Sequence, residues 1–448
     1  MSNVATPQIS GSYRELLKLF FPILAMTFSN GLFLLVEKLL LARYSIEAME
    51  VAVNAAYASQ ITQAACIALV MMAQVYVGRW VGAGELHRIG HAIWQLIWFS
   101  FLSMLVTVPF NIIYGYFYFR DTAIASNVMP YYYCLVAMNF LFPLAATLSS
   151  FYLGQGKTRF VLWATIIAQG IKLIFAYILI LGWGKIPAYG LMGGVISTFI
   201  AQAGFCIVLF CVFLNKKHSL LYNTHEWKFD LKLFKECIHP GFLRAMNRIL
   251  STTCWASIAH LMSSKGGDSL LILSLGGSLS LFLPFLSDAI CQAQATIVSN
   301  ILGAKNYQFL GKAFNSGLVL VLVAVGLMGI PLLFFPEHLL YYLFPTVVLD
   351  KATTYIVFFG VWASFAFFTF SFLPISYILA FKDTKFSLFM GFVNWINGFA
   401  LMYVAIDIVQ IEARHFWLVL SIMHATNALC YLLRMRWLQS KLFVQLST

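Results

Sequence analysis

The hydrophobic positions of this chain fall into long apolar runs separated by short polar stretches. A bilayer core of ~30 Å needs about 20 helical residues, and a window of about 19 residues finds twelve runs of that length. By residue number they are 16–42, 48–78, 90–115, 131–153, 160–182, 188–214, 238–263, 269–300, 311–335, 354–380, 386–408 and 416–437. The pattern therefore predicts an all-α, polytopic membrane protein with twelve transmembrane helices.

The chain also repeats itself once, at an interval that drifts slowly upward along the sequence. The matched positions are Pro22 with Pro240, Val81–Gly84 with Leu302–Lys305, and Lys157 with Asp383. Because each copy holds six spans, the two copies run parallel about an axis along the membrane normal. We predict two pseudo-symmetric six-helix lobes, residues 1–214 and 236–448, joined by a polar cytoplasmic linker, residues 215–235.

Composition and charge support the same class. Hydrophobic residues make up 61% of the chain and charged residues 10%, against about a quarter charged in a soluble domain. With both termini cytoplasmic, 18 basic residues lie in inside loops and 6 in outside loops, so the net charge of +12 reflects topology and no nucleic-acid partner is needed. The eight cysteines show no paired spacing, and we expect no metal site, disulfide framework or cofactor.

One carboxylate stands inside the first apolar run. A charge near the bilayer centre costs roughly 3 kcal/mol on insertion scales, which makes Glu37 a candidate for an ion or substrate pathway. The alternative is that Glu37 and Lys38 lie near the outer end and reach the headgroups. Counting helical rise from cytoplasmic marks puts Glu37 ~28 Å and Lys172 ~20 Å up, and a lysine stem can span that difference. We therefore predict that Lys172 faces Glu37.

A set of motifs, in order, resembles the multidrug and toxic-compound extrusion (MATE) family, whose superfamily also contains lipid-linked oligosaccharide flippases. The motifs are Leu16-x-Lys18 before Pro22, Val36-Glu37 where the family has Val-Asp, Gly82-Ala83-Gly84, Gly154-x-Gly156-Lys157-Thr158, the run 187–193, and Lys382-Asp383-Thr384. The resemblance covers nearly the whole chain. It implies a cation-coupled antiporter, driven by protons or sodium, that exports organic or drug-like solutes by alternating access.

The resemblance also suggests residue roles. The family's acid of the first helix binds the coupling ion, so Glu37 takes that role here, with Gln169 and Lys172 of the fifth span as polar partners. The chain departs from the family in the second lobe, where the seventh span offers Asn247 and Arg248 in place of an acid. We expect the substrate cavity to be lined by Asn247, Arg248, Asp288 and Gln292.

Two alternatives to the drug exporter stay open. A basic, acid-poor second lobe suits an anionic or lipid-linked substrate, which favours a flippase or anion exporter of the same superfamily. An intramembrane enzyme is disfavoured because the chain holds neither Asp-Asp-x-x-Asp nor His-Glu-x-x-His. We expect a monomeric transporter and no enzyme, in a bacterial inner membrane.

The depths of Arg248 and Asp288, ~18 and ~22 Å from the cytoplasmic edge, predict an ion pair in the second lobe. Removing one partner of a buried pair typically costs 3–5 kcal/mol of stability. Arg248→Met and Asp288→Leu should therefore each lower the thermal unfolding midpoint more than the double variant does. Simple addition of the two losses in the double variant would mean that each charge faces water separately.

Overall fold

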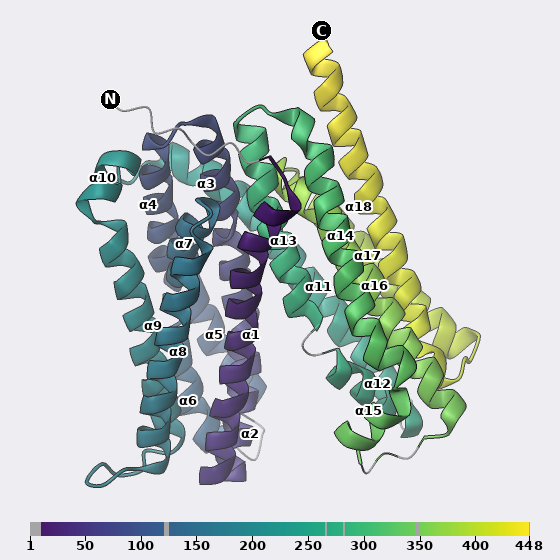
Figure 1. The fold of residues 1–448 in the computed structure, drawn as a ribbon. Helices are drawn as coiled ribbons and strands as arrows, with labels where there is room; N and C mark the ends of the chain where they lie inside the picture. The colour runs from purple at the N-terminus through teal and green to yellow at the C-terminus, as the bar shows by residue number, and fades with distance from the viewer. Residues whose placement is uncertain are drawn as a thin grey trace. The chain divides into compact units, whose positions relative to one another are not determined.

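The computed structural model describes residues 10–120, 125–264, 267–280, 283–345, 347 and 349–447. Within this part of the chain the regular structure is helical, apart from one isolated β-bridge between Trp183 and Ile186. Figure 1 shows long helices running side by side within each half of the chain. The predicted all-α class is therefore confirmed.

The helices of the first half are α1 (Tyr13–Tyr44), α2 (Ile46–Val70), α3 (Met72–Ala83), α4 (His87–Leu102), α5 (Met104–Phe119), α6 (Ala125–Ala137), α7 (Leu141–Gly154), α8 (Thr158–Leu181), α9 (Leu191–Phe213) and α10 (Lys216–Tyr222). Those of the second half are α11 (Leu231–Ser264), α12 (Gly267–Leu279), α13 (Leu283–Gly303), η1 (Tyr307–Phe309), α14 (Leu310–Gly329), η2 (Ile330–Phe334), α15 (Pro336–Leu343), α16 (Lys351–Ala380), α17 (Thr384–Tyr403), η3 (Val404–Ile408), η4 (Ala413–His415) and α18 (Phe416–Ser447).

Ten helical stretches of the described chain are long and apolar enough to cross a membrane, or eleven if a pair bent by 42°, α12 with α13, counts as one span. The ten are Tyr13–Tyr44, Ile46–Ala83, His87–Phe119, Val128–Gly154, Thr158–Leu181, Leu191–Phe213, Tyr307–Phe334, Lys351–Ala380, Thr384–Ile408 and Ala413–Val444. The remaining predicted span, 238–263, lies in α11, a continuous helix of 34 residues. Its charged residues, which include Lys235, Arg244 and Arg248, make α11 less apolar than the others.

Three predicted spans are interrupted in ways that hydropathy does not show. Single residues, Met71 and Ser103, separate α2 from α3 and α4 from α5. Residues 138–140 form a turn between α6 and α7. Pro143 then lies in the first turn of α7, where the missing N–H of proline has no helical partner to lose.

Backbone contacts divide the chain into two compact units. Of the described residues, the first unit contains Ala25–Ala245, and the second contains residues 10–24 together with the chain from Met246 onward. The division passes through α1 and α11, in each case within two turns after the helix's proline, Pro22 or Pro240. The lobe limits of 214 and 236 stay a prediction of domain organisation.

Both halves contain the same left-handed turns at the positions that the sequence repeat pairs. Gly84 (φ 74°) and Lys305 (φ 58°) follow α3 and α13, and Gly156 (φ 77°) and Lys382 (φ 61°) follow α7 and α16. A residue in this conformation commonly ends a helix because it lets the chain turn back on the last carbonyls. A lysine adopts the left-handed conformation only at an energetic cost. Both turns of the second half keep this conformation although lysine stands where the first half has glycine, which supports a common origin of the paired turns.

The stretch that joins the two halves of the sequence is tied to α4. The hydrogen bonds run from Trp94 Nε1 to the Thr224 carbonyl (2.7 Å), from Trp98 Nε1 to the Trp227 carbonyl (3.0 Å), from Gln95 Nε2 to the Lys228 carbonyl (2.9 Å), and from the Asp230 N–H to Gln95 Oε1 (3.1 Å). The connecting chain also passes close to α4 at Gly90. Residues 222–230 are therefore a packed strap of the first unit.

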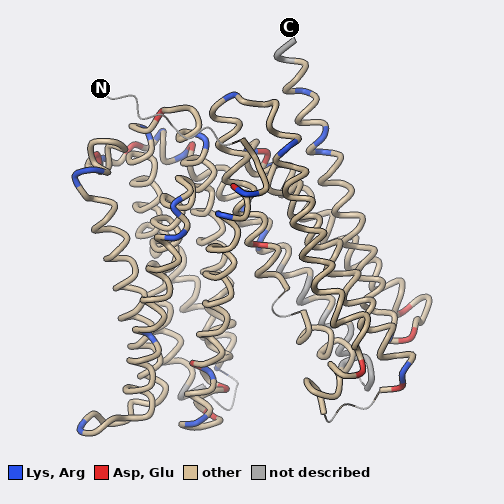
Figure 2. The backbone as a smooth tube through the Cα atoms, viewed as in Figure 1, with Lys and Arg blue, Asp and Glu red and all other residues tan. Residues whose placement is uncertain are grey.

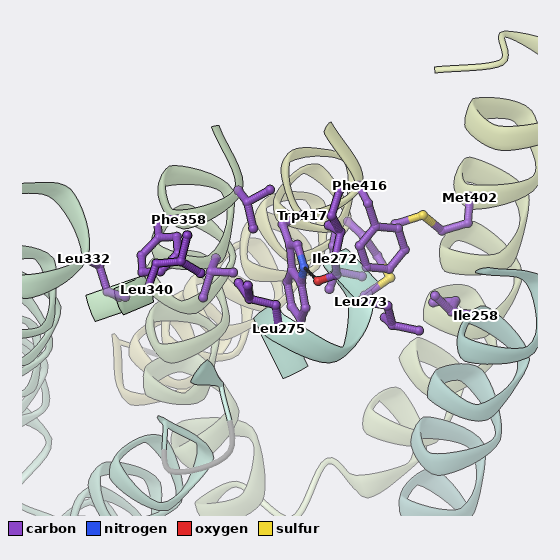
Figure 3. Close-up of a cluster of buried hydrophobic side chains, with 14 of the residues drawn as sticks. Ile258, Ile272, Leu273, Leu275, Leu332, Leu340, Phe358, Met402, Phe416 and Trp417 are labelled. Atoms are coloured by element: carbon purple, nitrogen blue, oxygen red, sulfur yellow. Dashed lines mark hydrogen bonds between the residues drawn. The ribbon is translucent and has the colours of Figure 1, made fainter. Parts of the chain in front are cut away.

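A cluster of buried apolar side chains lies in the second unit (Figure 3). Trp417 of α18 lies at its centre, 2% exposed, and its indole donates to the Ile272 carbonyl at 3.2 Å. Val361 and Phe358 of α16 and Leu420 of α18 are buried in the same cluster. The hydrogen bond to the Ile272 carbonyl satisfies the indole N–H of Trp417, whose ring is otherwise surrounded by apolar side chains.

Gly90 and Gly311, which lie the same interval apart in the repeat as Gly84 and Lys305, provide a matched test of the strap. A Cβ at Gly90 would lie 2.5 Å from the carbonyl oxygens of Tyr222 and Asn223, whereas nothing lies within 4 Å of a Cβ at Gly311. Gly90→Ala should therefore destabilise the protein by about 1–3 kcal/mol. Gly311→Ala should be neutral or stabilising, since alanine favours helices over glycine by up to about 1 kcal/mol. Thermal unfolding in one detergent compares the two, and equal midpoints would contradict the close approach.

Candidate functional site

Most charged residues of the described chain lie toward the ends of the helices (Figure 2). This distribution follows from the cost of placing charge in hydrocarbon. In the first unit, Glu37 and Lys38 on α1 and Lys172 on α8 lie within apolar membrane spans. They define the candidate site.

Glu37 and Lys172 form a buried ion pair. Lys172 Nζ lies 2.5 Å from Glu37 Oε2, and the two side chains are 13% and 10% exposed. The pairing that depth counting predicts is thus present in the structure. Two opposite charges at this distance largely cancel each other's field, so the pair costs far less to bury than either charge alone.

One further helix contributes a polar group to the carboxylate. Thr198 Oγ1, on α9, donates to Glu37 Oε1 at 3.3 Å. Sequence reasoning missed this residue, because a lone threonine in an apolar run is ordinary.

Gln169 does not bond to Glu37 in the structure. Its Nε2 donates instead to Asn30 Oδ1 at 2.9 Å, which joins α8 to α1 a second time. Asn30 precedes Glu37 by seven residues, or two helical turns. Helices α1 and α8 are therefore linked at two levels, by an amide pair and by an ion pair.

The predicted residues of the second unit lie on two helices. Asn247, on α11, donates to Ser387 Oγ at 3.2 Å, and Arg248 beside it is exposed. Asp288 and Gln292 lie one turn apart on α13 and are partly buried. Each of Arg248, Asp288 and Gln292 has an interaction partner. The ion pair between Arg248 and Asp288 stays a prediction.

The described residues contain no group of three or more His, Cys, Asp or Glu side chains that could hold a metal ion. At the Glu37 site one carboxylate is already neutralised by an ammonium.

The fold and the charged pair inside a helical bundle define a class, the multi-pass membrane transporter. The sequence model of the MatE family matches residues 22–178 and 245–404, which together make up more than half of the chain. The chain therefore belongs to the MatE family, as its motifs predict. The two matched segments are of nearly equal length and begin about as far apart as the repeated motifs, and family members are transporters and not enzymes.

The chain is also similar to proteins named as probable multidrug resistance proteins. The chain is 22% identical over 335 residues to a probable multidrug resistance protein NorM of Thermotoga maritima, covering 73% of this chain and 71% of that one. It is 23% identical over 300 residues to a probable NorM of Bacillus cereus, covering 65% and 64%.

Solved structures share the fold at low identity. One is a MOP superfamily transporter from Pyrococcus furiosus, described with the words "reverse polarity of binding pocket suggests different function", with a TM-score of 0.82, 14% identity and 96% of each chain covered. Another is an outward-facing multidrug resistance MATE family transporter, with a TM-score of 0.82, 12% identity and 96% of each chain covered. The predicted twelve-helix, two-lobe architecture is confirmed at the level of the fold.

Removal of one member of the Glu37–Lys172 pair should cost more stability than removal of both. Lys172→Met leaves an uncompensated buried carboxylate, a loss of about 3–5 kcal/mol, and the double variant Glu37→Gln, Lys172→Met should recover most of it. Lys351→Met is the control, because Lys351 and Glu337 form an exposed pair, 75% and 48% exposed. That change should leave the unfolding midpoint nearly unchanged, because an exposed pair is screened by solvent. A Lys172→Met variant as stable as the control would exclude an energetically coupled pair.

Proposed function

We propose that the protein is a secondary active antiporter that exports organic, drug-like solutes in exchange for protons. Transport proceeds by alternating access between the two six-helix lobes, residues 1–214 and 236–448. Membership of the MatE family and the multidrug names of its relatives support the transport class. The single observation that carries the coupling role is the buried Glu37–Lys172 pair inside a membrane-spanning bundle.

The composition of the pair favours a proton over sodium. Hard cations are held by several oxygen ligands at once. Around Glu37 one carboxylate oxygen is occupied by the Lys172 ammonium at 2.5 Å, and Thr198 Oγ1 bonds to the other. A proton needs only one carboxylate oxygen, so binding it requires no further oxygen ligands.

Proton binding has a direct mechanical consequence in this geometry. Protonated Glu37 no longer attracts the Lys172 ammonium, so the link between α1 and α8 at this level is weakened while the Asn30–Gln169 bond remains. The equilibrium between two arrangements of these helices then depends on proton occupancy. Such differential stability of two states is what a coupling ion must supply.

Orientation and assembly complete the proposal. Both termini face the cytoplasm of a bacterial inner membrane, because the basic residues are biased to the same side. The protein works as a monomer, with a small-molecule substrate and no cofactor. Asn247, Arg248, Asp288 and Gln292 line the substrate path, and Gln169 supports the coupling site.

A second candidate is export or flipping of an anionic or lipid-linked substrate. Arg248 is an exposed cation on α11, where a cationic drug would be repelled. The Pyrococcus furiosus transporter with the same fold is described as having a binding pocket of reversed polarity. The two candidates differ in cargo and share the coupling site.

Transport in proteoliposomes tests the proposal. An imposed pH gradient should drive accumulation of at least one of ethidium, rhodamine 123 and carboxyfluorescein, and a sodium gradient at constant pH should not. Glu37→Gln should abolish the proton-driven uptake while the protein stays folded, because the variant carries no exchangeable proton at this position. Glu337→Gln, a change of an exposed glutamate, is the control and should transport normally. Full proton-driven activity of Glu37→Gln would reject Glu37 as the coupling residue.

A further inference from the structure

Lys38 follows Glu37 in α1, but its ammonium contacts a different helix. Lys38 Nζ lies over the ring of Tyr57, on α2, 5.9 Å from the ring centroid. Among the described residues Lys38 has no carboxylate within ion-pair distance, and the neighbouring Glu37 is already neutralised by Lys172. The first unit therefore holds an unneutralised positive charge within a membrane span.

The contact with Tyr57 holds the Lys38 ammonium within the span, away from the end of α1. Lys38 lies six residues before the end of α1 at Tyr44, ~9 Å of helical rise. Tyr57 lies eleven residues after the start of α2 at Ile46, ~16 Å from the same end. Helical side chains tilt toward the N-terminus of their helix, which carries the Lys38 ammonium away from the α1–α2 turn and the Tyr57 ring toward it. The two groups therefore meet between these depths, and the ring contact compensates only in part for lost water.

The face of α2 that carries Tyr57 is polar and exposed. Glu50, Asn54, Tyr57 and Gln60 follow one another at helical spacing on this face, and Tyr57 is 64% exposed. Polar side chains in membrane spans rarely face lipid and instead border water or a ligand. Glu50 lies two turns nearer the outer end of α2 than Tyr57 and forms no ion pair with Lys38.

We propose that Lys38 and Tyr57 form a binding subsite for an amphiphilic organic anion, a carboxylate, sulfonate or phosphate attached to an aromatic or apolar body. The Lys38 ammonium donates charge-assisted hydrogen bonds to the anionic group, and the exposed Tyr57 ring packs against the body. The inference rests on the proposed transport function only in taking the bound anion as cargo. The anion comes either from a dissolved solute or from a lipid headgroup, since both present the same chemistry.

Equilibrium binding to the full-length protein tests the subsite without any gradient. Purified protein in nanodiscs of neutral phosphatidylcholine is titrated against 1-pyrenesulfonate and 1-pyrenemethylammonium by fluorescence anisotropy, with empty nanodiscs as background. Wild type should bind the sulfonate more tightly than the ammonium. Lys38→Gln should lose about tenfold or more in sulfonate affinity, the usual effect of a hydrogen bond to a charged group.

Matched variants separate charge from shape. Lys38→Arg should retain sulfonate binding, and Tyr57→Phe should retain it because the ring remains. Lys185→Gln removes an exposed lysine of an outer loop and should bind as wild type does. Gel filtration of each variant verifies that it is folded and monodisperse.

The source of the anion is assigned by competition with phosphatidylglycerol nanodiscs. If phosphatidylglycerol weakens sulfonate binding to wild type but not to Lys38→Gln, the natural anion is a lipid headgroup. If phosphatidylglycerol does not weaken sulfonate binding to wild type, the natural anion is a dissolved solute. Both results support the subsite. Equal sulfonate affinity in wild type and Lys38→Gln, or a preference for the pyrenemethylammonium, overturns it. Normal proton-driven transport by Glu37→Gln would reject the coupling proposal. If the same variant also binds sulfonate as wild type does, the subsite proposal stands.

Discussion

Charge is expensive in hydrocarbon, and the first unit depends on how it neutralises one carboxylate. Glu37 stays inside α1 because the Lys172 ammonium lies 2.5 Å away and Thr198 donates to its second oxygen. These side-chain contacts join α1 to α8 and α9. A group that holds helices together only while it is charged is suited to linking protonation to conformation.

The paired turns of the two halves share a backbone conformation but carry different charged residues. After α7, Lys157 bonds to His218 at 3.3 Å, and burial together with the nearby Lys217 charge lowers the pKa of Lys157. The paired residue after α16 is Asp383, which caps α17 and accepts hydrogen bonds from Arg434 at 2.8 Å. One backbone geometry thus carries a lysine at this position in one half and an aspartate in the other. The same divergence separates the acid-bearing α1 from the arginine-bearing α11.

Hydropathy and helical rise are enough to predict the number of spans and the depth of a residue within a span. Twelve apolar runs indicate twelve spans, and the depths of Glu37 and Lys172 predict that the two side chains meet. Breaks at Met71 and Ser103 leave no hydropathy signal, since the residues around them are as apolar as the rest of the run. The roles of Thr198 and Asn30, and the turn of Lys38 toward Tyr57, depend on how each helix is rotated against its neighbour, which a single sequence does not specify. Contacts of Arg248 and Asp288 likewise depend on that rotation.

Infrared difference spectroscopy of the purified protein, recorded between alkaline and acidic pH, tests the central claim most directly, because a carboxylic acid C=O stretch reports protonation without requiring transport. The account predicts a band from one buried carboxyl group that is present at acidic pH in wild type, absent in Glu37→Gln, and shifted in frequency in Lys172→Met. An unchanged band in Glu37→Gln would show that Glu37 does not exchange a proton, and would contradict the account.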